Sequence, residues 1–400
     1  MKILKKDVSR RQFLKEVTTG LFDLTIIPSV SRDSQSKLKD RPFIYRTLGK
    51  TGLKLPIVSM GVMNANNPNL VSAALDAGII LLDTAWYYQN GRNEEMIGEV
   101  IKDRPRNSYV ISTKIFEPRD RITDRFPANA KSDTFVAKFE TSLRRLGLDY
   151  VDLLSIHNIY KPEDVLFEPY LNAMLKLKKE GKTRFIGLST HQNEPAIIRE
   201  ARVSKKYDVI LTAYNFRQAH RKEIEGEMEL AVKEGMGFVG MKAIAGSVYN
   251  IGRKVHVNAK AALKWALQNE NIHTNIAGFT TFDQMETALS VMENLKLTPE
   301  EEADLEGSKH YSSLYCQQCE VCRSQCHAGL DIPTLMRSYM YAYGYKNLQA
   351  AKEALNQGQI SRIACIDCDS CNVRCAMGFD VRERALSLSK IQDVPESFLV

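Results

Sequence analysis

Asp83, Lys114 and His157 each stand at the end of a short apolar run of β-strand type, and Tyr88 follows Asp83 by five residues. A buried ion is costly unless it is paired, so we expect Asp83 and Lys114 to form an ion pair between neighbouring strands. An ammonium group near a phenol lowers the pKa of the phenol, so Tyr88 could donate a proton to a carbonyl oxygen near neutral pH. His157 could donate a hydrogen bond to the same oxygen and orient the substrate. These residue types predict proton donation to a carbonyl oxygen.

All eight cysteines lie between positions 316 and 375, in two copies of the motif C-x2-C-x2-C-x3-C. With this spacing, which is that of bacterial ferredoxins, three thiolates bind one [4Fe-4S] cluster while the fourth binds the other cluster. Two copies supply the ligands that two such clusters need. The predicted ligands are Cys316, Cys319, Cys322, Cys326, Cys365, Cys368, Cys371 and Cys375.

Zinc and disulfide bonds are the alternatives for the cysteines. Zinc prefers four ligands in a tetrahedral arrangement, and this motif crowds three thiolates into one turn. A disulfide framework needs cysteines that are spaced for pairing, whereas these occur in runs. The spacing therefore favours clusters over both alternatives.

Short apolar runs rich in β-branched residues alternate with segments of helical periodicity over roughly 270 residues. Eight such β/α units predict a parallel sheet closed into a (β/α)8 barrel, the TIM-barrel fold. A doubly wound sheet is less favoured, because no Gly-rich phosphate loop follows the first run. The predicted strands are Ile57–Val62, Ile79–Asp83, Tyr109–Thr113, Val151–Ile156, Phe185–Leu188, Val209–Ala213, Phe238–Met241 and Thr274–Ala277.

Three of these strand ends carry recognisable motifs. The strings D-T-A-x-x-Y ending at Tyr88, S-T-K ending at Lys114 and L-x-x-H ending at His157 resemble the aldo-keto reductase family, from about residue 43 to 310. The resemblance implies a β/α barrel, a bound nicotinamide cofactor (NADP or NAD) and a catalytic tetrad of Asp83, Tyr88, Lys114 and His157. Tyr87 is out of phase with the family motif and receives no role.

The resemblance also implies where the nicotinamide cofactor binds. Leu211 stands where the family has a glutamine, and Thr190 stands where it has an asparagine. Asp283 stands where the family has an arginine for the 2′-phosphate of NADPH, and an acid there would repel a phosphate, so NADH and NADPH both stay open. The predicted contacts are Ser189, Thr190, Tyr214, Met241, Lys242, Gly278, Phe279 and Thr280.

The composition changes after a helical segment at 299–309 and becomes rich in cysteine and tyrosine. Between the two cysteine motifs, apolar positions from Ile332 to Tyr343 trace a helical face, and Leu348 to Leu355 is helical too. We therefore expect a leader and linker at 1–41, a barrel at 42–310 and a small α-helical ferredoxin-like domain at 311–400. The last of these should return to the active face of the barrel and shape the pocket.

The N-terminal region carries the excess charge. Residues 1–50 hold 12 Lys and Arg against 5 Asp and Glu, a surplus that equals the net charge of +7 of the whole chain. The remainder is neutral, which argues against a nucleic-acid-binding face on the folded body. The string Ser9-Arg10-Arg11-Gln12-Phe13-Leu14-Lys15 resembles a twin-arginine export signal. We expect export to the periplasm or a membrane-tethered location, with the cytoplasm as the alternative, and no transmembrane helix, because no apolar run is long enough.

Two functions follow from these parts. In the first, the barrel reduces a small carbonyl substrate by hydride transfer, with Tyr88 as the general acid, and the cluster domain is structural or shapes the pocket. In the second, the chain is an electron-transfer iron–sulfur protein whose barrel serves as a docking scaffold, and a redox protein would be its partner. The complete tetrad favours the first.

Overall fold

The computed structural model describes residues 41–120, 123–246, 257–308, 314–368, 370–395 and 398. The predicted leader, including the twin-arginine-like string, lies outside the described residues apart from Arg41. Residues Arg41–Val400 form one compact unit. Within the described part of the chain, no helix is both long and apolar enough to span a membrane.

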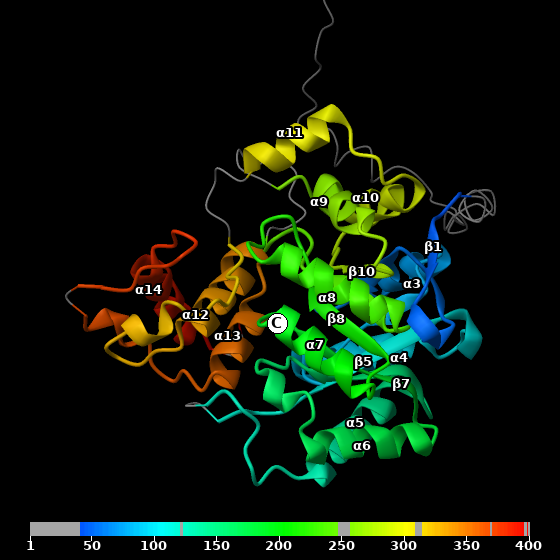
Figure 1. The fold of residues 1–400 in the computed structure, drawn as a ribbon, viewed down its shortest axis with the longest axis horizontal. Coiled ribbons are helices and arrows are strands. Elements are labelled where there is room, and N and C mark those ends of the chain that lie inside the picture. Colours follow the sequence, from blue (N-terminus) through cyan, green and yellow to red (C-terminus); the bar gives the residue numbers. More distant parts are fainter. Residues whose placement is uncertain are drawn as a thin grey trace, which may run out of the picture. The chain divides into compact units, whose positions relative to one another are not determined.

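Eight parallel strands close into a barrel in the order β10-β3-β4-β5-β6-β7-β8-β9 (Figure 1). Each strand overlaps one of the apolar runs predicted to be a strand, which confirms the predicted (β/α)8 fold. Closure comes from β10, which pairs with both β3 and β9. The strands are β3 (Val58–Gly61), β4 (Leu81–Asp83), β5 (Val110–Phe116), β6 (Val151–His157), β7 (Thr183–Thr190), β8 (Val209–Ala213), β9 (Gly237–Met241) and β10 (Thr274–Ala277).

Helices follow the strands and cover the outside of the barrel. In α5, Phe135, Phe139, Leu143 and Leu146 are buried, so the predicted apolar stripe faces the strands. The helices are α3 (Pro68–Asp76), α4 (Arg92–Ile101), α5 (Ser132–Leu146), α6 (Glu168–Lys179), α7 (Glu194–Ser204), α8 (Arg221–Lys233), α9 (Ala259–Gln268) and α10 (Phe282–Glu293). Short 3₁₀ segments are η2 (Tyr88–Gly91), η3 (Arg106–Ser108) and η4 (Pro162–Asp164).

A hairpin closes the amino-terminal end of the barrel. Strands β1 (Tyr45–Thr47) and β2 (Lys54–Pro56) pair antiparallel around the 3₁₀ turn η1 (Gly49–Thr51). Leu48 and Leu55 pack in one core cluster with residues of five barrel strands, including Leu81 and Val110. Because this end is filled with side chains, only the carboxyl end of the strands is left for a site.

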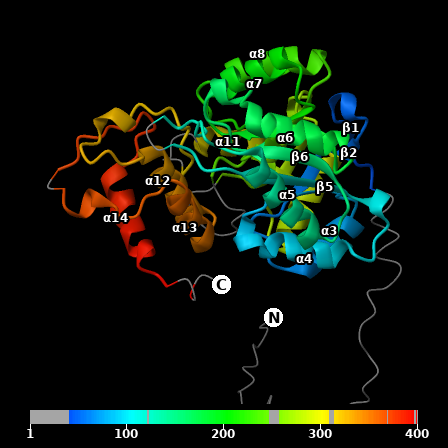
Figure 2. The ribbon, with the colours of Figure 1, turned by 90° about the horizontal axis from the view of Figure 1, so that it is seen from below.

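The cysteine-rich region is helical, as predicted. After α11 (Pro299–Ser308) come α12 (Ile332–Tyr339), which continues into the π-helical turn η6 (Met340–Gly344), then α13 (Leu348–Gln357) and α14 (Val381–Gln392). In Figure 2, α12, α13 and α14 lie together on one side of the barrel. The short segments η5 (Arg323–Gln325) and η7 (Ala364–Ile366) each lie within a cysteine motif.

The two cysteine motifs end in the same local structure. Gly329 and Gly378 adopt positive φ angles, and their amides donate to the carbonyls of Cys326 and Cys375. Asp331 and Asp380 then accept hydrogen bonds from backbone amides in the first turns of α12 and α14. Each fourth cysteine is thus held in a turn that leads directly into a capped helix.

Candidate active site and cysteine centre

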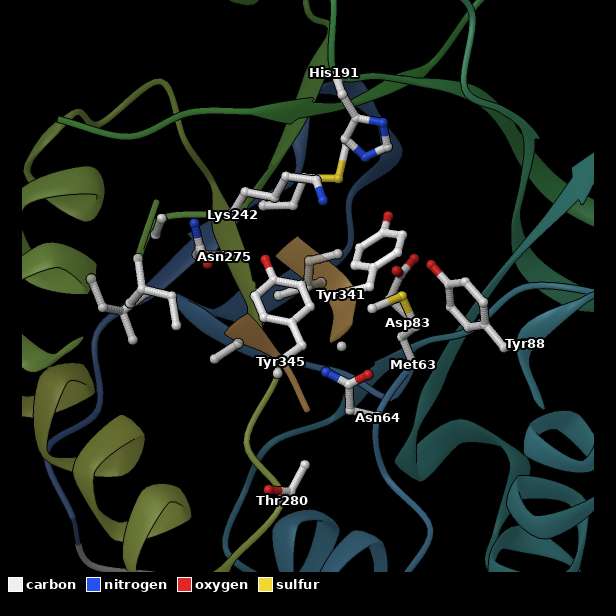
Figure 3. A pocket seen from close by; sticks show the side chains of 18 of the residues that line it. Met63, Asn64, Asp83, Tyr88, His191, Lys242, Asn275, Thr280, Tyr341 and Tyr345 are labelled. Carbon is white, nitrogen blue, oxygen red and sulfur yellow. The ribbon is translucent and has the colours of Figure 1, made fainter. Parts of the chain in front are cut away.

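A cavity opens at the carboxyl ends of the barrel strands. A site is expected at this end because side chains fill the amino end. The cavity has a volume of about 150 Å³ and is lined by three members of the predicted tetrad, Asp83, Tyr88 and His157. Tyr341 and Tyr345 of the helical region also line it (Figure 3).

Asp83 and Lys114 form the predicted ion pair across β4 and β5. Lys114 Nζ lies 2.6 Å from Asp83 Oδ2, and both residues are 1% exposed. Ser112 donates to the other carboxylate oxygen at 2.7 Å, and Lys114 also donates to the Thr84 carbonyl at 2.6 Å. Burial raises the pKa of Asp83 and lowers that of Lys114, while each charge opposes the shift of the other. The pair can be tolerated in the core because its remaining hydrogen-bonding groups have partners.

Tyr88 is placed by the turn that follows β4. Gln89 and Asn90 have positive φ angles, and the Gln89 amide donates to the carbonyls of Met63 and Ala65. This arrangement holds the Tyr88 ring 5.2 Å from Lys114 Nζ. Figure 3 shows the hydroxyl directed toward Asp83.

The expected lowering of the Tyr88 pKa is wrong. Burial raises this pKa well above the usual value, and the neighbouring Tyr87 and Asp83 raise it further. Lys114 does not offset this shift, because its charge is already paired with Asp83. Tyr88 is therefore protonated at neutral pH and holds the proton that a reduced carbonyl oxygen would need.

Two neutral histidines complete the polar side of the cavity. Burial lowers the pKa of His157 and of His191 well below the usual value, and nearby cations lower both further. Asn158 donates through its amide to Tyr160 Oη, so its Oδ1 accepts from His191 Nδ1 at 2.7 Å. His191 therefore carries its proton on Nδ1 and presents Nε2 as an acceptor. The Nδ1 atom of His157 is buried and has no partner among the described residues.

Four of the eight predicted cofactor contacts line the cavity: Met241, Lys242, Gly278 and Thr280. Figure 3 shows Lys242 near His191 at one end, with Thr280 at the opposite end. The Thr280 amide donates to Gln284 Oε1 at 2.7 Å, which ties the loop after β10 to the first turn of α10.

The other four predicted contacts are buried beside the cavity and do not line it. Ser189 accepts from the Asn158 amide, and Thr190 donates to two backbone carbonyls. Tyr214 stacks on a tryptophan and donates to Glu225. Phe279 is fully buried. Ser189 and Thr190 position the residues that follow β6 and β7. Tyr214 and Phe279 serve packing.

The structure adds cavity residues that the sequence did not single out, chiefly Asn64, His191, Asn275, Gln284, Tyr341 and Tyr345. Asn275 is 1% exposed, and its Nδ2 group has no partner among the described residues. An unpaired buried amide facing a cavity is costly unless a ligand binds it. The polar residue within a buried strand was the one signal in the sequence that could have indicated Asn275.

The lining fits a nicotinamide dinucleotide in its donor groups. Asn275 offers an unpaired amide, and Thr280 and Gln284 lie at the amino-terminal end of α10, where helix amides favour phosphate. Leu211 packs in the barrel core with Leu48, so an apolar contact replaces the family's glutamine. Asp283 is exposed in the first turn of α10.

The cysteines divide into two groups that mix the motifs. Burial raises the pKa of Cys316 to about 12, with contributions from Cys322, Cys375 and Cys319. Burial raises the pKa of Cys365 to about 11, and here the contributing neighbours are Cys326, Cys368 and Cys371. The fourth cysteine of each motif therefore lies with the first three of the other, as the ferredoxin spacing predicts.

Hydrogen-bonding contacts that involve side chains connect the two cysteine loops. The Arg374 amide donates to Gln325 Oε1 at 2.7 Å, and the Asn372 side chain lies 3.1 Å from His327 Nε2. All eight cysteines are unpaired thiols. Among the described residues, no three Cys, His, Asp or Glu side chains converge on a single-ion site. A cubane needs a different arrangement, because each thiolate binds its own iron atom, and the crossed groups of four fit that donor set.

Comparisons with known proteins agree with this architecture. A sequence model of the aldo/keto reductase family matches residues 61–254, and a model of the 4Fe-4S dicluster domain matches residues 315–380. L-galactose dehydrogenase of Arabidopsis thaliana is 35% identical over 157 residues, which covers 36% of this chain and 47% of that protein. Aldo-keto reductase AFTS1 of Alternaria alternata is 26% identical and covers 68% of this chain and 93% of its own length.

A solved structure shares the barrel. Aldo-keto reductase AKR11C1 from Bacillus halodurans, in its holo form, matches with a TM-score of 0.54 at 22% identity, covering 66% of this chain and 96% of that one. At this identity the likeness concerns the fold. The two sequence models match separate segments of the chain, an aldo/keto reductase segment followed by a 4Fe-4S dicluster segment, and the solved structure shares the barrel fold.

Proposed function

We propose that this protein is a nicotinamide-dependent oxidoreductase that reduces an aldehyde or ketone. The observation that carries the proposal is the convergence of Asp83, Tyr88, Lys114 and His157, from three neighbouring strand ends, on one cavity. Each of these groups taken alone has an ordinary structural explanation, but their meeting beside one cavity does not.

The nicotinamide, when bound, supplies the hydride that adds to the carbonyl carbon. Tyr88 then gives its phenolic proton to the carbonyl oxygen, which becomes the hydroxyl of the product. The raised pKa of Tyr88 keeps that proton in place until negative charge develops on the oxygen. The ammonium of Lys114 lies 5.2 Å from the ring and is the cation beside the phenolate that remains.

His157 and Asp83 act by positioning. Neutral His157 can donate one hydrogen bond to the carbonyl oxygen without adding a competing charge. Asp83 holds Lys114 in place and balances its charge. Asn275, Thr280 and Gln284 are the residues we assign to binding the cofactor, NADP or NAD.

We further propose that the eight cysteines bind two [4Fe-4S] clusters with a structural role. Support comes from α12 and η6, which pack against the cysteines on one face and place Tyr341 in the cavity wall. Tyr339, Tyr341 and Tyr343 pack against the cysteine core, and Tyr341 and Tyr345 line the cavity, so Tyr341 contacts both. Clusters that transferred electrons would instead require a redox protein partner.

The direct test is carbonyl-dependent oxidation of NADH and NADPH by protein purified without oxygen, over a panel of short aldehydes and ketones. Turnover with at least one carbonyl, and none without, supports the proposal. Cofactor binding without turnover of any member of the panel would contradict it.

We also propose that residues 1–41 direct export through the twin-arginine route, which carries proteins already folded around their cofactors. A reporter fused to this segment should be exported, and replacing Arg10 and Arg11 by Lys should stop export. Export that is insensitive to both substitutions would contradict the proposal.

A further inference from the structure

Two cations beside the cavity have no acidic partner. Arg337 on α12 is 6% exposed, and its guanidinium donates to Tyr160 Oη at 2.8 Å and to Thr334 Oγ1 at 3.2 Å. Lys242 follows β9, has a positive φ angle and contacts only aromatic rings, with Nζ 5.4 Å from Tyr341 and 5.9 Å from Tyr345. Among the described residues, neither cation lies within ion-pair distance of a carboxylate.

The two cations border neighbouring cavities that share lining residues. Arg337 lines a recess together with Tyr87, His157, His191 and Tyr341, and the last four residues also line the main cavity. Lys242 lines the main cavity. Burial and the charge of Arg337 together lower the pKa of Lys242 to about 7.

The acidic groups near this space have other partners or lie too far away. Asp83 is paired with Lys114. Glu353 of α13 lines the recess, accepts from Gln349, and has a pKa that burial raises to about 7. Asp331 caps α12 and lies 3.6 Å from Arg323. Among the described residues, no carboxylate therefore lies within ion-pair distance of either cation. Burial lowers the pKa of Arg337, but Tyr160, Tyr341 and Asp331 together raise it above the usual value.

Arg337 is buried and Lys242 is partly buried, and an anion bound between these two cations would offset the cost of holding like charges there. A guanidinium has five donor groups, and the two named contacts leave others for a planar oxyanion. We propose that Arg337 and Lys242 bind the anionic group of the substrate, so that the reductase acts on a small carbonyl compound bearing a carboxylate or a phosphate. This inference rests on the proposed reductase function.

The position of Arg337 favours substrate over cofactor as the source of the anion. Arg337 lines the recess behind His157 and Tyr87, and it is absent from the lining that includes Gly278, Thr280 and Gln284 at the start of α10. A substrate whose carbonyl oxygen lies at Tyr88 and His157 could extend its charged end into this recess. A residue of the iron–sulfur domain would then determine substrate specificity in the barrel.

The test compares pairs of aldehydes in which one member carries an anionic group that the other lacks: succinic semialdehyde with butanal, and glyceraldehyde 3-phosphate with glyceraldehyde. For the cluster-loaded full chain we expect kcat/KM to favour at least one charged member by about tenfold or more, which corresponds to one charge-assisted contact. Arg337→Met should remove most of that preference through KM, and Arg337→Lys should restore part of it. Lys161→Met, which removes a cation paired with Glu320 outside this space, should keep the preference.

The controls separate the possible failures. The cluster absorption of Arg337→Met should equal that of the parent, and its affinity for NADH and NADPH should not change. Equal kcat/KM for charged and neutral members in the parent protein would overturn the inference while leaving the reductase intact. A loss of cofactor affinity with unchanged selectivity would assign the cations to a cofactor phosphate and also overturn it. If Arg337→Met fails to fold, competition between succinate and butanal on the parent decides the matter, and no competition would refute the site.

Discussion

The barrel and the cysteine-rich region stabilise their buried polar groups in different ways. In the barrel, buried charges have protein partners: Asp83 pairs with Lys114, and Asp152 binds both Arg106 and Arg184. In the cysteine-rich region, a small core is built around thiols such as Cys322 and Cys365, whose pKa values burial raises to about 11. Thiols with such raised pKa values stay protonated at neutral pH unless a metal binds them as thiolates.

The cavity therefore has two walls that come from different parts of the chain. Strand ends provide Asp83, Tyr88 and His157 through the backbone ladder of the barrel. The opposite wall, with Tyr341 and Tyr345, belongs to a helical region whose core includes six of the eight cysteines. We therefore expect chemistry to depend on the first wall and substrate affinity on the second.

The largest expected effect concerns the chemical step. Tyr88→Phe removes the proton donor and should lower kcat for carbonyl reduction by about 10²–10⁴-fold, the usual contribution of general acid catalysis. Nucleotide affinity should not change, because the hydroxyl is directed toward Asp83. Tyr87→Phe is the matched control and should cost much less. Equal losses in the two variants would show that Tyr88 is not the acid.

The next effect concerns the stability of the barrel. Asp83→Ala leaves Lys114 as an unpaired buried charge and should lower the free energy of unfolding by about 3–5 kcal/mol. Denaturant unfolding followed by circular dichroism measures this loss. Glu99→Ala breaks the exposed ion pair with Lys102 and should leave the denaturant midpoint of unfolding unchanged. A midpoint shift of similar size in both variants would mean that the buried pair does not stabilise the barrel.

Cysteine substitutions test the crossed ligand groups in the other wall. Cys375→Ser should produce the same change in the EPR spectrum as Cys322→Ser, and Cys326→Ser should match Cys371→Ser, because each pair affects one cluster. All four variants should raise KM more than they lower kcat, because the helices that carry Tyr341 and Tyr345 lose their support. If Cys375→Ser matches Cys371→Ser instead, each motif binds its own cluster.

The smallest effect is a pH dependence of anion binding. Lys242, with a pKa lowered to about 7, is charged below that pH and neutral above it, so succinate affinity should fall several-fold from about pH 6 to pH 8. Glu353 loses a proton over the same range and acts in the same direction. The facing His191 stays neutral, and Tyr341 and Tyr345, whose pKa values burial raises, stay protonated.

Titration calorimetry on two variants separates the groups in this pH dependence. Lys242→Met should flatten most of the pH profile, while Glu353→Gln should flatten the rest. A profile that both variants leave unchanged would show that neither group faces the bound anion.

Much of the barrel could be predicted from the sequence, because strand ends share one edge of the sheet. Asp83, Lys114 and His157 could be assigned from local apolar runs alone. Tyr341 and Arg337 could not, because a stripe of apolar and aromatic residues on α12 is what core packing also produces. The direction of the Tyr88 pKa shift could not be predicted for a related reason. Only the three-dimensional structure shows that Lys114 pairs with Asp83 rather than with Tyr88.

The central claim is that hydride chemistry occurs in the barrel while the clusters serve the fold. The most direct measurement mixes protein purified without oxygen with NADH or NADPH and follows the nucleotide and cluster spectra together, before and after a carbonyl substrate is added. The account predicts that the nucleotide is oxidised only after the carbonyl is added and that the cluster spectrum stays constant. Bleaching of the clusters by nucleotide alone would contradict it and favour electron transfer.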